Sequence, residues 1–256
     1  MKDDNPRDSF PARLEDMCAL AIKRGQPVYS AFLNDREQYE AEKLLGKRSG
    51  IDILFWGGNE VCMRRILRVS SPDMYAGSDF DDFPVYPVTL TFRKADRPGH
   101  RDFLGSFMAL GIKRETVGDI FIGEGTAAVF CTGTARDMIT GSITTVGRIG
   151  VSVSDGLTAQ AKECIAPPKI SEMTITVSSQ RADCIVAGIT GMSRERSAEF
   201  IRSGGFMQNY TECENVSRNV SEGDTLTLRG YGKFIVGGEP GLTHKGRLRI
   251  TIKKYI

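Results

Sequence analysis

The residues with the clearest chemical signal lie in the stretch "MSRERSAEFIRSGG", which runs from Met192 to Gly205. Ser193 is a good N-cap and the final Gly pair a good stop, so a helix is predicted between them. Its first turn carries Arg194 and Arg196, although the positive end of the helix dipole favours acidic residues there. A bound anion would offset this repulsion, because the free N–H groups of a helix start also attract anions. The sequence therefore predicts an anion contact at this helix.

The alternative is that Arg194 folds back onto a carboxylate. Glu195 and Glu199 on the same helix and Asp183 on the preceding predicted helix are the candidates. In that case the arginine would be structural and would bind no anion.

Further cations lie close by in the sequence. In "RGYGKF" (229–234) aromatic residues alternate with basic ones, a composition that suits contacts with RNA. The candidate RNA-binding residues are Arg181, Ser193, Arg194, Arg196, Arg202, Arg229 and Lys233.

The charge distribution favours the same region. From Ser179 onward the chain carries 12 Lys and Arg against 8 Asp and Glu, while the rest carries 22 against 24. A basic segment on a nearly neutral body is typical of proteins that bind nucleic acid.

Other chemistry has little support. The chain contains neither a C-x-x-C motif nor histidines at metal-binding spacing, and the G-x-G-x-x-A match at 123–128 precedes a strand rather than a helix. We therefore expect no metal, no cofactor and no catalytic residue. The rival interpretation is an RNA-modifying enzyme, of the pseudouridine synthase or methyltransferase type, with an active site in the middle of the chain built on Asp102, Asp119 or Asp137.

Composition bears on location. Six cysteines are widely scattered, the first ten residues lack the apolar core of a signal peptide, and no apolar run is as long as a membrane span. We expect a cytoplasmic, monomeric protein with reduced thiols and no membrane partner.

Three segments are predicted to position these residues, in an α+β fold. Residues 1–75 are expected to form an N-terminal α/β domain with helices in 11–25 and 35–46 and a strand in 51–58. Three arginines at 64, 65 and 68 are interpreted as a solvated face. A polar, acidic stretch at 70–84 is expected to be a linker.

Residues 82–165 show the element order β-α-β-β-α-β. This is the split β-α-β arrangement that RNA-recognition motifs also use. An RNA-recognition motif stacks bases on aromatic residues of its inner strands, and here "AAVFCT" offers only Phe130. The segment is interpreted as an RNA-recognition-motif-like scaffold without the usual stacking platform.

Residues 179–256 are predicted to form a module of two short helices and a small β region. The closing segment "RLRITIKKYI" is expected to be an edge strand, with basic residues that guard the edge or contact a nucleic-acid backbone.

This last module resembles the S-four RNA-binding domain, over about residues 179–240. The motifs that carry the resemblance are "QRAD", "SRERSAEFIRSGG", "MQN", "EGDTL" and "LRGYGKF". Across that superfamily the helix pair lies on RNA phosphates.

The whole chain resembles the bacterial YlmH-like family, on "FLNDREQ" (32–38), "HRDFLGSFMALGIKRETVGDI" (100–120) and the terminal module. This resemblance implies a non-enzymatic protein that binds ribosomal RNA and tRNA at the large ribosomal subunit. It also implies a role in ribosome-associated quality control of stalled translation. A cell-division adaptor remains a further alternative. The RNA helix that is bound, the part played by the N-terminal domain and any contact of the middle domain with RNA stay open.

Overall fold

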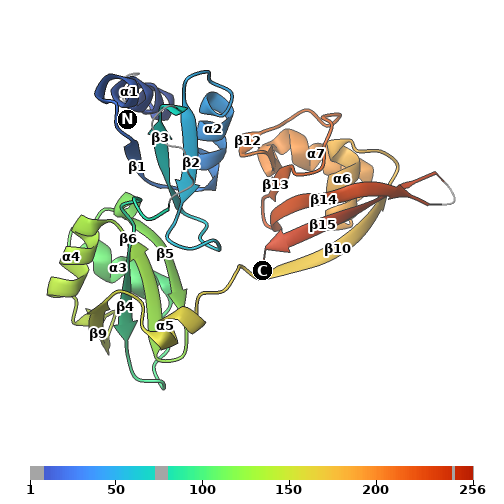
Figure 1. Cartoon of the computed structure of the whole chain (residues 1–256). Coiled ribbons are helices and arrows are strands. Elements are labelled where there is room, and N and C mark those ends of the chain that lie inside the picture. Colours follow the sequence, from blue (N-terminus) through green and yellow to red (C-terminus); the bar gives the residue numbers. More distant parts are fainter. Residues whose placement is uncertain (1–8, 73–79, 244–245, 256) are drawn as a thin grey trace. The chain divides into compact units, whose positions relative to one another are not determined.

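The structure is a computed structural model that describes residues 9–72, 80–243 and 246–255. It divides into two compact units, Met1–Pro167 and Pro168–Ile256 (Figure 1).

The first part of unit Met1–Pro167 is a three-stranded antiparallel sheet with two helices. Its elements are α1 (Phe10–Arg24), β1 (Val28–Leu33), α2 (Asp35–Leu45), β2 (Asp52–Trp56) and β3 (Arg65–Ser70), with strand order β1-β3-β2. Helix α1 begins after Ser9 and ends at Gly25, which is left-handed with φ +62°, and α2 begins with a capping box at Asn34. The predicted helices and the predicted strand are confirmed here.

The basic stretch around β3 differs from the prediction of a solvated face. Arg68 is only 1% exposed and pairs with Asp82 at 3.5 Å, and its guanidinium lies 5.6 Å from the ring centroid of Phe83. The described end of the expected linker packs here as well, since Phe80 stacks on Trp56 at 4.1 Å. Residues 80–83 thus cover one face of the first sheet, while residues 73–79 lie outside the described residues.

The second part of this unit has the predicted β-α-β-β-α-β order. The six elements are β4 (Tyr86–Thr91), α3 (His100–Ala109), β5 (Val117–Ile122), β6 (Thr126–Cys131), α4 (Gly133–Ser142) and β9 (Ser152–Asp155). The sheet order is β5-β6-β4-β9, and a small hairpin of β7 (Thr145–Val146) and β8 (Ile149–Gly150) precedes β9. A one-turn 3₁₀ helix at Arg114–Thr116 leads into β5, and α5 (Ala159–Glu163) follows β9. Helices α3 and α4 share a core with the sheet through Phe103, Phe107 and Ile139.

The predicted domains 1–75 and 82–165 fall within one compact unit. Polar contacts and close packing join them: Asp119 of β5 accepts hydrogen bonds from the backbone N–H groups of Met63 and Arg64, and Gly118 lies against Phe32 of β1. A Cβ added at Gly118 would lie 2.7 Å from the Phe32 ring, so this contact requires glycine. The division into three domains stays a prediction, since the structure separates two units only.

Unit Pro168–Ile256 is a six-stranded antiparallel sheet with two helices on one face (Figure 1). Its strands are β10 (Ile170–Val177), β11 (Phe206–Gln208), β12 (Thr211–Glu212), β13 (Thr225–Leu228), β14 (Gly232–Leu242) and β15 (Leu248–Tyr255), in the order β10-β15-β14-β13-β11-β12. Its helices are α6 (Ala182–Thr190) and α7 (Arg194–Phe200), and a π-helical turn (Ile201–Gly205) continues α7. The predicted start of α7 at Ser193 is confirmed, and the turn contains Gly204 in the left-handed conformation.

The terminal strand is not at an edge, so this prediction was wrong. β15 pairs with β14 on one side and with β10 on the other, where the register runs from Ile170 opposite Tyr255 to Val177 opposite Leu248. Strand β10 is the edge, and its Ile175 and Val177 belong to the core. The module therefore begins at Pro168, before the predicted start at residue 179, because the preceding segment completes the sheet.

Candidate nucleic-acid interface

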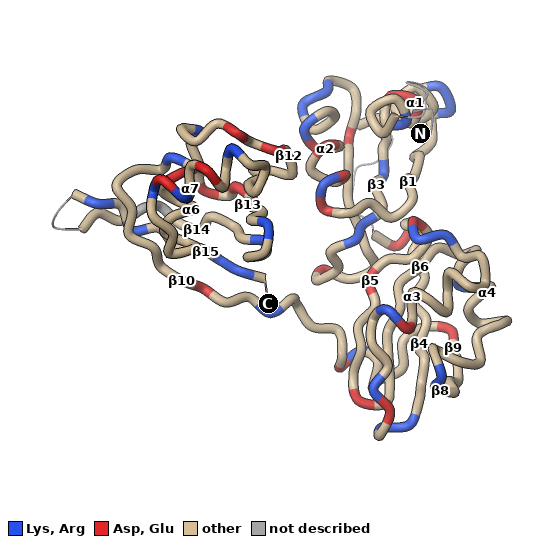
Figure 2. Tube along the Cα trace, turned by 180° about the vertical axis from the view of Figure 1, so that it is seen from behind, with Lys and Arg blue, Asp and Glu red and all other residues tan. Residues whose placement is uncertain are grey.

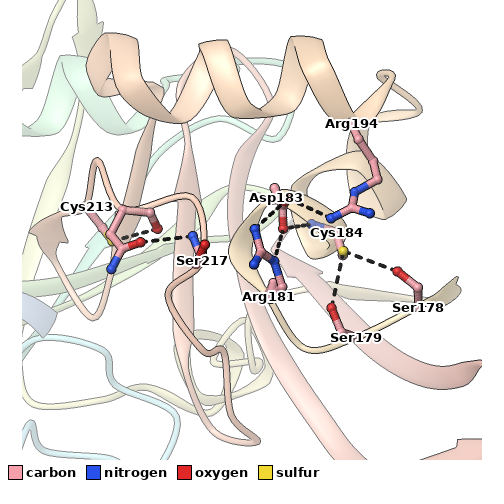
Figure 3. A network of polar contacts seen from close by, with 9 residues as sticks. Ser178, Ser179, Arg181, Asp183, Cys184, Arg194, Cys213 and Ser217 are labelled. Carbon is pink, nitrogen blue, oxygen red and sulfur yellow. Dashed lines mark hydrogen bonds and ion pairs between the residues drawn. The ribbon is translucent and has the colours of Figure 1, made fainter.

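The candidate site is organised around Asp183, on the first turn of α6. Arg181 binds this carboxylate with two nitrogens, Nε to Oδ1 at 3.1 Å and Nη2 to Oδ2 at 3.2 Å. Arg194, the first residue of α7, donates from Nη2 to Oδ2 at 2.9 Å, and the backbone N–H of Cys184 donates to Oδ1 at 3.0 Å. Figure 3 shows the two guanidinium groups reaching Asp183 from different elements. The carboxylate thus connects the starts of both helices.

The electrostatics of this cluster favour the charged carboxylate. Burial by itself raises the pKa of Asp183, but the hydrogen bonds from Arg181 and Arg194 outweigh it and lower the pKa to about 2. Asp183 is 7% exposed, whereas the Arg194 side chain is 60% exposed. The negative charge of Asp183 is therefore buried, whereas the positive charges of Arg181 and Arg194 face solvent. The three residues together have a net charge of +1.

Arg194 does pair with Asp183, which is one of the three carboxylates that the alternative interpretation considers. The contact occupies only Nη2 of a group that has five N–H donors. Arg194 is consequently held in place and still presents donors to solvent. The ion pair with Asp183 is therefore compatible with an anion bound to the exposed N–H groups of the same guanidinium.

Ser193 has a local role. Its Oγ accepts a hydrogen bond from the backbone N–H of Arg196 at 3.3 Å, and its carbonyl accepts one from the hydroxyl of Ser197 at 3.0 Å. The N-cap prediction is confirmed. Contact of Ser193 with RNA stays a prediction.

The remaining predicted residues fall into two places. Arg196 and Arg202 are exposed, and neither side chain has a hydrogen bond or ion pair within the described ranges 9–72, 80–243 and 246–255. Arg229 lies beside the end of α7, where its Nη2 donates to the carbonyl of Ser203 at 3.3 Å. These three arginines are therefore on the helix side of the sheet.

Lys233 is separated from that group. Its neighbours on β14, Phe234 and Val236, point into the core shared with the helices, so Lys233 points to the opposite face of the sheet. There its Nζ donates to the Tyr210 hydroxyl at 3.1 Å and lies 5.1 Å from the ring centroid of Tyr255. Lys233 therefore lies on the face opposite the arginines, because alternation along a strand reverses the face at every residue. Contact of Lys233 with RNA stays a prediction.

Lys and Arg positions in unit Pro168–Ile256 include α7 and β15, with acidic positions among them (Figure 2). Of the basic cluster at the C-terminal end, Arg247 and Arg249 are exposed and Lys253 pairs with Glu172 across the β10–β15 register at 3.6 Å. Lys245 and His244 lie outside the described residues.

A second polar cluster, in unit Met1–Pro167, contains Asp119, one of the three aspartates of the rival enzyme interpretation. Asp119 Oδ2 accepts from the backbone N–H of Met63 at 2.6 Å and of Arg64 at 2.8 Å, and burial raises the pKa of this carboxyl although those bonds lower it. Arg64 donates to the carbonyls of Val117 and Phe32 at 3.1 and 2.9 Å, and Arg114 also donates to Val117. Burial, followed by the charge of Arg114, lowers the pKa of His100 beside this cluster. The contacts hold two parts of the unit together.

The other two rival aspartates are engaged elsewhere. Asp102 accepts from the backbone N–H of Gly99 at the start of α3, at 2.7 Å, and Asp137 pairs with its neighbour Arg136 at 2.8 Å. Each aspartate thus serves a different local contact. Within the described part of the chain, no group of three or more His, Cys, Asp or Glu is arranged to hold a metal ion.

The sheet face that an RNA-recognition motif would use for stacking is covered. Phe130 of β6 is 1% exposed, and a Cβ at Gly58 would lie 2.4 Å from its ring, so the first part of the unit packs directly on it. On the same face, Thr89 accepts from the backbone N–H of Thr158 before α5, and Cys164 donates to the carbonyl of Phe121. The chain itself occupies this surface.

Comparisons with known proteins bear on the same segments. Residues 81–159 match the family model described as a putative RNA-binding domain in YlmH. The chain is 27% identical over 226 residues to "Ribosome-associated protein quality control protein P2" of Bacillus subtilis (strain 168), which covers 87% of this chain and 85% of that protein. It is also similar to the structure titled "Cell division protein ylmH from Streptococcus pneumoniae", with 19% identity and a TM-score of 0.49, over 60% of this chain and 93% of the other. Among the described residues, no helix is long and apolar enough to cross a membrane.

Proposed function

We propose that this protein binds RNA and acts in ribosome-associated quality control, and that the arginines around α6 and α7 hold RNA phosphates. The observation that carries the proposal is the arrangement at Asp183, where a buried carboxylate fixes Arg181 and Arg194 while their remaining donors stay exposed. Arginine suits phosphate because its planar donors match two oxygens at once. Exposed Arg196 and Arg202 extend the cationic surface.

The biological setting is proposed from the comparisons. The Bacillus subtilis relative is named as a ribosome-associated quality control protein and aligns over most of both chains, and residues 81–159 match an RNA-binding domain family. On this basis the RNA is ribosomal RNA and tRNA at the large ribosomal subunit, reached in the cytoplasm by a monomer.

The mechanism proposed is positional and not enzymatic. The three aspartates of the rival interpretation have separate structural partners, and the arginine cluster offers hydrogen-bond donors and positive charge. Such groups bind and orient an anionic polymer. The chemistry of translation would be left to the ribosome.

The test is co-sedimentation of the full chain with purified large and small ribosomal subunits over a range of KCl concentrations. We expect binding to large subunits, with log K falling against log salt at a slope of roughly −3 to −5, as counterion release from about four to six phosphates requires. Equal binding to both subunits would remove the large-subunit assignment. A flat salt response would remove phosphate binding itself.

A further inference from the structure

A shallow pocket of about 240 Å³ lies beside Arg194, where the end of β10 meets α6. Its wall is formed by Thr176 and Ser178 at the end of β10, by Arg194, and by Arg247 just before β15. Val177, Cys184, Ala187 and Gly188 complete the lining. The pocket thus combines the first residue of α7 with the end of the edge strand β10 and the residue that precedes its neighbour β15.

The charge of the pocket favours an anion. Two arginines line it, and none of its described lining residues is acidic. The nearest carboxylate, Asp183, already accepts bonds from Arg181, from the Cys184 backbone and from a single nitrogen of Arg194. Its charge is balanced by Arg181, so the positive charges of Arg194 and Arg247 are available to a ligand.

Other contacts hold the side chain of Arg194 and the backbone of Arg247. Arg194 is oriented from behind by Asp183. The backbone of Arg247 is held by Thr243, since its N–H donates to Thr243 Oγ1 at 3.0 Å and its carbonyl accepts from Thr243 N–H at 2.8 Å. Within the described ranges of unit Pro168–Ile256, the Arg247 side chain has no hydrogen bond or ion pair.

The polar and apolar parts of the pocket also fit a phosphodiester. The Ser178 hydroxyl lies 3.4 Å from Cys184 Sγ at the pocket wall and can turn to donate to an oxygen (Figure 3). A Cβ at Gly188 would lie 3.0 Å from Val177, so α6 approaches β10 closely and the apolar floor is shallow. The volume is below the roughly 300–1,000 Å³ of clefts that bind whole small molecules, which favours one unit of a polymer over a free nucleotide.

We propose that this pocket binds a single backbone phosphate of the RNA, with Arg194 and Arg247 donating to its two non-bridging oxygens and Ser178 assisting. The inference rests on the proposed function and adds Arg247, which lies outside the segment that resembles the S-four domain. The strands β10 and β15 therefore do more than complete the sheet, because they bring a second arginine opposite Arg194.

The test compares Arg247→Ala with Arg249→Ala in the full chain. Both arginines are exposed and lie in the same stretch of chain, and each substitution removes one positive charge. Arg249 pairs with Thr176 in the strand register and does not line the pocket. With large-subunit ribosomal RNA as the probe, we expect Arg247→Ala to weaken binding about tenfold and to reduce the salt slope by about one, as loss of one phosphate contact requires. Arg249→Ala should weaken binding by about twofold or less.

A second pair of variants places a negative charge in the pocket. Ser178→Asp would put a carboxylate beside the two arginines, where it competes with phosphate, and Ser171→Asp adds the same charge at an exposed position near the other end of β10. We expect Ser178→Asp to lose most of its RNA binding and Ser171→Asp to retain it. Both variants should have the Tm of the wild type.

Three outcomes would overturn the proposal. Equal losses from Arg247→Ala and Arg249→Ala would mean that general charge, and not the pocket, attracts RNA. Stabilisation of the wild type against heat by millimolar inorganic phosphate, together with an unchanged RNA affinity in Arg247→Ala, would mean that the pocket holds a free anion and not an RNA phosphate. Failure of the wild type to bind ribosomal RNA would remove the proposed function together with the pocket, whereas the first two outcomes leave that function standing.

Discussion

Both units of the molecule place a carboxylate among arginines, but the two arrangements differ in what they leave exposed. Asp119 is held by two backbone N–H groups, and the arginines beside it donate to backbone carbonyls. Asp183 is held by the arginine side chains themselves, and those side chains reach solvent. The first cluster uses its cations to join segments of the chain, whereas the second keeps them available for a ligand.

The surfaces around the two clusters also differ in what they leave exposed. Residues 81–159 match an RNA-binding domain family and have the element order of an RNA-recognition motif, yet the face that such motifs use is packed against the chain's own segments. Unit Pro168–Ile256 has exposed arginines on the helix side of its sheet. The order of helices and strands therefore does not by itself locate a binding surface. A surface can bind RNA only if the chain's own segments leave it exposed.

The largest effect is expected from shortening unit Pro168–Ile256. A fragment of residues 168–256 should fold, whereas a fragment of residues 179–256 lacks β10 and loses Ile175 and Val177 from the core. Full burial of two such side chains contributes roughly 3–6 kcal/mol, a large share of the stability of a small domain. Urea unfolding followed by circular dichroism measures the difference, and equal stability of the two fragments would show that β10 is dispensable.

The Asp119 cluster should matter for stability and not for RNA. Asp119→Ala leaves two backbone N–H groups without their acceptor, so we expect a loss of about 3 kcal/mol in unfolding free energy with unchanged affinity for ribosomal RNA. The matched control is Asp137→Ala, whose carboxylate is 68% exposed and which should shift Tm by no more than about a degree. A loss of RNA binding in Asp119→Ala at a temperature where the protein is folded would contradict the division of roles.

The two carboxylates should also respond oppositely to pH. The folded-state pKa of Asp183 is about 2, below its ordinary value of 3.8, so its contribution is complete above about pH 4 and is lost as pH falls toward 2. The pKa of Asp119 is raised in the folded state, so ionisation of that group costs stability as pH rises through 4 and above.

Urea titrations of the wild type, Asp183→Asn and Asp119→Asn between pH 2.5 and 7 would measure both contributions. We expect the advantage of the wild type over Asp183→Asn to shrink toward the acid end. Its advantage over Asp119→Asn should shrink toward neutral pH. The same sign for both variants would show that exposed Arg181 and Arg194 are too well screened to lower the pKa of Asp183.

The sequence predicted features whose signals are local. The start of α7 follows from Ser193, and the end of the π-helical turn that continues it follows from a glycine pair. The order of elements in residues 82–165 follows from short apolar runs separated by turns. These depend on neighbours within a few residues, so they can be read without the fold.

What the sequence could not predict depends on distant partners. β15 looked like an edge strand because its partner β10 is some seventy residues earlier, and Arg68 looked solvated because its partner Asp82 lies in a segment interpreted as a linker. Arg194 has its partner on the preceding helix, and among three nearby acids only the fold selects Asp183. Arg247 carried only a general signal of positive charge, and its place opposite Arg194 needs the pairing of β10 with β15.

We propose that the exposed arginines of unit Pro168–Ile256, and not the unit that matches an RNA-binding family, supply most of the phosphate contacts. The most direct measurement is the salt slope of binding to large-subunit ribosomal RNA for two double variants of equal charge, Arg194→Gln with Arg196→Gln and Arg101→Gln with Arg148→Gln. All four arginines are exposed. We expect the first pair to reduce the slope by about two and the second to leave it within about half a unit of the wild type. A larger loss of slope from the pair at Arg101 and Arg148 would contradict this assignment of the phosphate contacts and place the RNA on unit Met1–Pro167.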